Sequence, residues 1–128
     1  MLVNQLSVFM ENKEGRLEQV LETLAEDNIN INSLSLAEAT DYGILRMLVS
    51  DPETGKKALR EKGFMARLTP VLAVDVADEV GQLQVVFTKI KQAGINIEYV
   101  YSMKAGGDGA TIIIRTSDLE KTEEVLKV

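Results

Sequence analysis

The amino-acid sequence contains the same pattern twice, offset by 66 residues, which is the separation between Leu6 and Leu72. At this offset, apolar residues fall on apolar residues and turn residues fall on turn residues. A fixed internal period indicates that a chain is built from copies of one supersecondary unit. The matching segments are 6–10 with 72–76, 12–15 with 78–81, 17–24 with 83–90 and 29–31 with 95–97.

The first copy reads as strand, helix, strand, strand, helix, strand, and the second repeats this order up to its second helix. Leu6, Val8 and Met10 alternate with residues of a second face, as in a strand that buries one side. The apolar residues of 17–24 have the spacing of one helix stripe, and Asp51-Pro52 is typical of a helix start. Further strands are expected at 29–39, 44–49 and 64–68, and in the second copy at 95–104 and 111–116, with a turn at 105–110.

This order predicts an α+β fold: two ferredoxin-like βαββαβ units in tandem, each an antiparallel sheet with helices on one face. We expect the first repeat at 1–69 and the second at 70–128, with only Thr69-Pro70 between them. Nothing in the second copy matches Lys62–Leu68, so the second unit is expected to lack its last strand. The edge beside Val71–Val76 would then be open and covered by another chain, which predicts a dimer or larger homo-oligomer.

The amino-acid composition argues against several classes of function. The chain has no cysteine and no histidine, which removes thiolate chemistry, the commonest metal ligand and the usual general base near neutral pH. Its net charge of −6 argues against nucleic-acid binding. No apolar run is long enough for a transmembrane helix and the N-terminus does not resemble a signal peptide, so we expect a cytoplasmic protein without a membrane partner.

Two motifs in register carry a family resemblance. The first copy reads Asn12-Lys13-Glu14-Gly15-Arg16-Leu17, then Asn28-Ile29-Asn30-Ile31; the second reads Asp78-Glu79-Val80-Gly81-Gln82-Leu83, then Gly94-Ile95-Asn96-Ile97. These segments resemble the Asp/Asn-x-Pro-Gly-x-Leu loop and the Gly-x-Asn-Ile segment of ACT domains, although both copies lack the proline. The resemblance is close to small bacterial tandem ACT proteins, and ACT domains bind amino acids or similar small metabolites between two domains and regulate enzymes or transcription factors. It therefore implies a free-standing sensor or a regulatory subunit, for which we expect neither catalytic activity nor a cofactor.

The residues themselves leave alternatives open at each candidate position. Gly15 and Gly81 are expected either to let the backbone approach a ligand closely or to adopt a positive φ in a tight turn. The helix amides that follow would suit a carboxylate. Asn12 and Asp78 could either bond loop amides or reach a ligand's ammonium group. The resemblance adds further ligand contacts at Arg16, Leu17, Asn30, Gln82, Leu83 and Asn96.

We therefore predict an amino-acid sensor with up to two sites at the seam between repeats. Each site is expected to take its loop from one copy and its asparagine from the other. The segments 33–36 and 99–103 carry apolar residues on both faces, which predicts strands that pair with each other or are covered. The main alternative is a ligand-free module that docks an enzyme or its own copy. An acyl-phosphate hydrolase is a weaker alternative, because Arg16 has only Gln82 as its counterpart.

Overall fold

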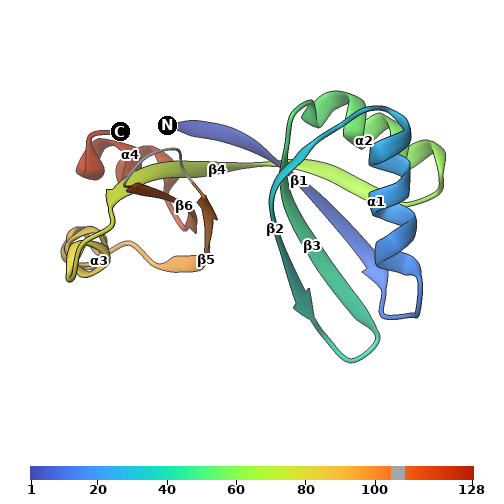
Figure 1. Ribbon diagram of the computed structural model, residues 1–128. Coiled ribbons are helices and arrows are strands. Elements are labelled where there is room, and N and C mark those ends of the chain that lie inside the picture. The colour runs from blue at the N-terminus through green and yellow to red at the C-terminus, as the bar shows by residue number, and fades with distance from the viewer. Residues whose placement is uncertain (105–108) are drawn as a thin grey trace. The chain divides into compact units, whose positions relative to one another are not determined.

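The computed structural model describes residues 1–104 and 109–128, which form six strands and four helices (Figure 1). Most of the expected turn 105–110 therefore lies outside the described residues. None of the helices in the described ranges is both long and apolar enough to cross a membrane. The elements are β1 (Leu2–Glu11), α1 (Arg16–Glu26), β2 (Ile31–Glu38), β3 (Tyr42–Val49), α2 (Pro52–Glu61), β4 (Met65–Ala77), α3 (Gln82–Gln92), β5 (Ile97–Lys104), β6 (Gly109–Thr116) and α4 (Leu119–Leu126).

The chain divides into two compact units. The first unit consists of Asn4–Thr69, and the second of Pro70–Val128 together with Met1–Val3. Hydrogen bonds order the strands as β2-β3-β1-β4 in the first unit, and as β1-β4-β6-β5 in the second, where β1 contributes only its first residues. This is the expected arrangement of two βαββαβ units, and the α+β fold prediction is confirmed.

The core of the first unit lies between its sheet and its helices. Leu6, Val8 and Met10 of β1 are buried there, together with apolar residues of β3, α1 and α2. Full burial of a leucine or valine side chain stabilises a fold by about 1.5–3 kcal/mol. The alternate residues of β1 point to the other, helix-free face, where Phe9 is 42% exposed. The predicted period-2 pattern and helix stripe are both confirmed.

The second unit repeats this core with residues of the second copy. They are Leu72, Val74, Val76, Ile90, Ile95, Ile112 and Ile114. The helix ends also correspond, because Asn28 after α1 and Gly94 after α3 both adopt a positive φ, of 57° and 72°. Glycine and asparagine are the residues that tolerate this conformation at the end of a helix.

The fourth strand of the first unit and the first strand of the second are one continuous strand. β4 runs through Thr69 and Pro70, which were expected to separate two strands. Proline has no N–H to donate, so a strand tolerates it only where that donor is not needed. Here its carbonyl oxygen accepts a hydrogen bond of 2.6 Å from Nη1 of Arg115.

The edge that the missing strand would cover is partly paired by the N-terminus. The Ala73 N–H donates to the Met1 carbonyl oxygen at 2.9 Å, and the Met1 amino group donates to the Ala73 carbonyl oxygen at 3.2 Å. Two reciprocal bonds between one pair of residues are the mark of an antiparallel ladder. Met1–Val3 thus lies where the fourth strand of the unit belongs. The prediction of a wholly open edge beside Val71–Val76 is wrong at Ala73.

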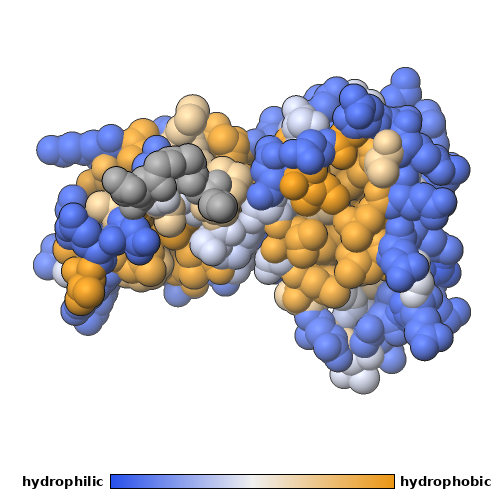
Figure 2. All heavy atoms as spheres, viewed as in Figure 1, coloured by the Kyte–Doolittle hydropathy of each residue, from blue (hydrophilic) through white to orange (hydrophobic). Residues whose placement is uncertain are grey.

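The strands β2 and β5 are the outer strands of their units, so they do not pair with each other within the chain. The alternative that they are covered stays a prediction. Both keep large apolar residues that remain about half exposed. Leu34 and Leu36 lie opposite the buried Met47 and Leu45, yet are 46% and 47% exposed. Figure 2 shows hydrophobic residues gathered over the strands of the first unit, beside a hydrophilic surface over α1.

Candidate functional site

Each unit has a strand–loop–helix turn that centres on a glycine. Gly15 has φ 81° and ψ −7°, and Gly81 has φ 87° and ψ −7°. This left-handed conformation is costly for residues with a Cβ atom. At both glycines, the space where a Cβ would point contains no other atom within 4 Å. The positive-φ alternative is therefore confirmed, and the turn leaves open space on that side of the backbone.

The helices that follow these glycines begin without a side-chain cap. Neither α1 nor α3 has a side chain that accepts from its first-turn amides. In contrast, Asp51 caps α2 by accepting from the Thr54 N–H at 3.2 Å, and Asp118 caps α4 by accepting from the Lys121 N–H at 3.0 Å. Uncapped first-turn N–H groups carry positive partial charge and need an acceptor from water or a ligand.

The first-turn amides show where an anion could bind. The N–H of Arg16 donates to the Lys13 carbonyl oxygen and that of Gln82 to the Glu79 carbonyl oxygen, both at 3.3 Å. The hydrogen bonds of residues 1–104 and 109–128 include none from the amides of Leu17 or Leu83. Both leucines sit directly after the loop, in the second position of their helix. A ligand carboxylate at these amides would satisfy donors that the fold leaves to solvent.

The cations of the first loop are partly neutralised. Nη2 of Arg16 lies 3.8 Å from a carboxylate oxygen of Glu11, and Nζ of Lys13 lies 3.6 Å from the other. Nη1 of Arg16 also donates to the Gln19 side chain at 3.0 Å. Exposed ion pairs of this kind contribute little, so a ligand carboxylate can compete with Glu11 for both cations. The same loop borders a cavity of about 310 Å³ that is lined in part by Glu11, Arg16 and Gln19.

Asn12 and Asp78 do not cap their loops. The backbone N–H of Asn12 donates to the Asp41 carbonyl oxygen at 2.9 Å, and that of Glu79 donates to the Ala77 carbonyl oxygen at 2.9 Å. Both side chains are exposed, and among the described residues neither forms a hydrogen bond with a loop amide. The structure therefore gives no support to loop capping at these positions, and a role of either side chain in ligand binding stays a prediction.

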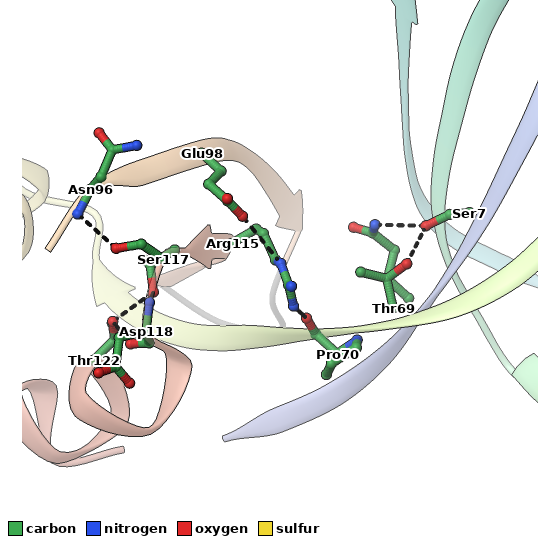
Figure 3. Close-up of polar contacts among 11 residues, drawn as sticks. Ser7, Thr69, Pro70, Asn96, Glu98, Arg115, Ser117, Asp118 and Thr122 are labelled. Carbon is green, nitrogen blue, oxygen red and sulfur yellow. Dashed lines mark hydrogen bonds and ion pairs between the residues drawn. The ribbon is translucent and has the colours of Figure 1, made fainter.

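Asn30 and Asn96 immediately precede β2 and β5, and their main chains are held identically. The N–H of Asn96 donates to the Ser117 hydroxyl at 3.1 Å, while the Ser117 N–H donates back to the Asn96 carbonyl oxygen at 3.0 Å. Asn30 forms the same pair of bonds with Ser50. Figure 3 shows that the Asn96 side chain points away from Ser117. Both asparagines are exposed, and Nδ2 of Asn30 donates to Oδ1 of Asn32 at 2.9 Å.

Within one unit, the loop and the asparagine lie at opposite ends of the sheet. Asn12 is bonded to Asp41, just before β3, whereas Asn30 is bonded to Ser50, just after β3. A strand rises about 3.4 Å per residue, so an eight-residue β3 places these ends roughly 25 Å apart. In the second unit, Ala77 pairs with Gly109 at the start of β6, and Asn96 is bonded to Ser117 after its end. The structure therefore brings the loop residues of each copy together, but not with the asparagine of the same copy.

A further hollow in the first unit was missed by the sequence analysis. A cavity of about 560 Å³ lies on the first unit and is lined by Ser7, Val8, Phe9, Ile44, Arg60, Phe64, Met65, Ala66 and Arg67. The sequence feature that could have indicated this hollow is Phe9. It is an aromatic residue in β1, on the strand face opposite to the core residues.

A family model and solved structures match this chain over nearly its whole length. The model of a family described as the ACT domain pair matches residues 1–128. A search of curated proteins found no match. The crystal structure of protein BT0572 from Bacteroides thetaiotaomicron is 43% identical, with a TM-score of 0.93 over 99% of this chain and 88% of that one.

Two more distant structures share the fold alone. The regulatory subunit of aspartate kinase from Thermus thermophilus, in its ligand-free form, is 19% identical with a TM-score of 0.68, over 99% of this chain and 93% of that one. The corresponding subunit from Thermus flavus is 20% identical with a TM-score of 0.68, over 99% and 92%. The family match covers the whole chain and both motifs. The chain therefore belongs to the ACT domain pair family.

Proposed function

We propose that the protein is a non-catalytic sensor of a free amino acid. The observation that carries this proposal is the pair of uncapped, glycine-initiated helix N-termini, α1 and α3, in a chain whose other two helices are capped by aspartate. A carboxylate would accept from the Leu17 or Leu83 amide, and Asn12 or Asp78 would face the ammonium group. Membership of the ACT domain pair family supports this assignment.

A complete site on this proposal needs two ACT units. The loop and the asparagine of one unit are roughly 25 Å apart along the sheet, too far for both to contact a single amino acid. Each loop is then completed by an asparagine of another unit, Asn30 or Asn96. We retain 1–69 and 70–128 as the two repeats, and we propose a homo-oligomer, at least a dimer.

The outer strands offer surfaces for such association. Leu34, Leu36 and Val100 are 43–47% exposed although their cross-strand neighbours belong to the cores. Exposed apolar strand edges are normally protected by charge or by a partner. The regulatory partner, on the same proposal, is an enzyme that responds to the occupied state, as the names of the distant aspartate kinase structures suggest.

A thermal-shift screen against the standard amino acids tests the proposal. A ligand at about 100 times its Kd stabilises a fold by about 2.7 kcal/mol, which raises the Tm of a small domain by several degrees. We expect one amino acid, or a small group of similar ones, to produce this shift at millimolar concentration. If none does, the ligand-free interaction module replaces the sensor as the function.

A further inference from the structure

The helix-free face of the first unit is unusually apolar. The strand register places Phe9 opposite Ile44, and the Phe9 ring stacks on Tyr42 with 5.0 Å between ring centroids and 18° between planes. Met65 lines the same hollow and is 69% exposed. The outer face of an antiparallel sheet is normally polar. A group of large apolar side chains around a hollow therefore indicates a binding surface.

Arg67 lies on the same face as this apolar group. The Thr69 hydroxyl is 2.9 Å from that of Ser7, which alternation places on the helix-free face together with Phe9. Alternate residues of a strand share a face, so Met65 and Arg67 of β4 lie on that side as well. Arg67 is exposed and also lines the hollow.

The hollow has a second cation in a fixed position. Nε of Arg60 donates to the Ala66 carbonyl oxygen at 2.8 Å, which holds the guanidinium group against the end of β4. In the part of the chain that the structure describes, neither Arg60 nor Arg67 forms an ion pair. The remaining N–H groups of both guanidinium groups are thus available to an anion.

The local charge is opposite to that of the whole chain. Residues 56–67 contain five of the 14 lysine and arginine residues and one acid, in a chain of net charge −6 with 20 acids. A basic segment in an acidic protein, beside an exposed apolar hollow, matches an anionic molecule with an apolar body. The volume of about 560 Å³ is within the range of small-molecule sites.

We propose that this hollow binds a small carboxylate with an apolar body, of the medium-chain or aromatic type. The carboxylate lies at Arg60 and Arg67, and the apolar body lies over Phe9, Ile44 and Met65. No residue of the Gly15 loop lines this hollow, although Phe9, Phe64 and Met65 also line the cavity that Arg16 borders. The cations Arg60 and Arg67 line the hollow and not that cavity, so we assign the hollow a second ligand class, distinct from the amino acid proposed above.

The test uses the full chain and the anionic amphiphile 1-anilinonaphthalene-8-sulfonate, whose fluorescence rises in apolar sites. We expect saturable binding that octanoate displaces and that octanol, which has the same chain without the charge, does not. Arg67→Gln should weaken displacement by octanoate about tenfold, the loss typical of a charge-assisted hydrogen bond. Met65→Ser should weaken binding of the dye itself.

Matched variants control for charge and for apolar surface. Lys91→Gln removes an exposed cation of the second unit, and Val128→Ser removes an exposed valine of the same unit; both should behave as wild type. Met65 and Arg67 are exposed, so circular dichroism should show all four variants folded. The proposal is overturned if no saturable dye signal appears, if Arg67→Gln and Met65→Ser bind as wild type does, or if octanol competes as well as octanoate. The thermal response to amino acids should survive Arg67→Gln, so the two proposals fail separately.

Discussion

The first and second units present the same loop with the same backbone but different charges. The central glycines differ by only 6° in φ (81° and 87°) and share a ψ of −7°. Around this common turn, the first loop places Lys13 and Arg16, whereas the second places Asp78 and Glu79. The same turn is thus present in both copies, while the charged side chains around it differ.

The difference between the loops is smaller than the sequence suggests. Glu11 lies within 4 Å of both cations of the first loop, and Glu18 adds an acid to the first turn of α1. The first turn of α3 has no acid. The first loop still holds two cations and the second holds none, so we expect the first to bind a ligand carboxylate more tightly.

The largest expected effect comes from the glycines that the loops share. Gly15→Val and Gly81→Val should each abolish binding at their own loop, with a loss of about a hundredfold or more, because a branched side chain disfavours positive φ and fills the open space beside the backbone. Isothermal titration calorimetry of the amino acid found in the thermal screen measures this loss.

Gly63 provides the matched control. It has φ 89° and an equally empty Cβ position, yet it lies between α2 and β4, outside both loops. Gly63→Val imposes the same backbone strain outside both loops, but Gly63 also lines the cavity beside Arg16, so it is the control for Gly81→Val. It should reduce stability and leave amino-acid affinity at the second loop nearly unchanged. Equal losses from all three variants would show that strain, and not the loop, is being measured.

The charges around the loops should have a smaller effect, and it should have the same sign in both loops. Glu11→Gln releases Lys13 and Arg16, and Glu79→Gln removes an acid from the second loop; each should tighten binding at its own loop. The gain is about 1 kcal/mol, or about fivefold in affinity, for a partly screened charge near the ligand. Calorimetry on both variants decides this, and unchanged affinities would mean that the ligand carboxylate does not lie at the loops.

The repeat could be predicted from the sequence because local signals agreed in both copies. Alternation over 6–10, the helix stripe over 17–24 and the Asp51-Pro52 start are each determined by neighbouring residues, and each is present in the structure. The positive φ of Gly15 and Gly81 follows from the same local chemistry.

Features that depend on distant pairing could not be predicted in this way. Nothing near Met1 indicates that it bonds Ala73, 72 residues away. The residues Thr69-Pro70 are typical of a linker, but β4 pairs with β1 on one side and β6 on the other, and these two residues lie within it. The separation of each loop from its own asparagine is likewise a property of β3 and β6, which lie between them. The Glu11 ion pairs depend on side-chain placement, which residue spacing does not determine.

Substitution of Asn30 and of Asn96 also compares the two loops, and its effect on ligand affinity should be intermediate. If the first loop forms the stronger site, the family resemblance pairs it with the asparagine of the other repeat, and Asn96→Ala should lower affinity more than Asn30→Ala. Loss of one hydrogen bond to a charged ligand group costs about 1.5–3 kcal/mol. Asn32→Ala removes the neighbour that accepts from Asn30 and serves as a control. Equal losses, with two ligands bound per chain, would favour equivalent loops instead.

The smallest expected effect concerns the contrast between capped and uncapped helices. The hydroxyl and the backbone N–H of Thr54 donate to Asp51, and these bonds lower the pKa of its carboxyl below the usual 3.8. A lowered pKa stabilises the fold at pH values above 3.8, and that contribution is lost as the pH falls through the lowered pKa. The start of α2 should therefore loosen in acid, whereas α1, which has no side-chain cap to protonate, should not change by this route. NMR of the Thr54 amide during titration from neutral pH to about pH 2 measures the effect, and Asp51→Asn, which keeps an acceptor but does not titrate, should abolish it. An identical titration of the Thr54 amide in Asp51→Asn would assign the change to another acid.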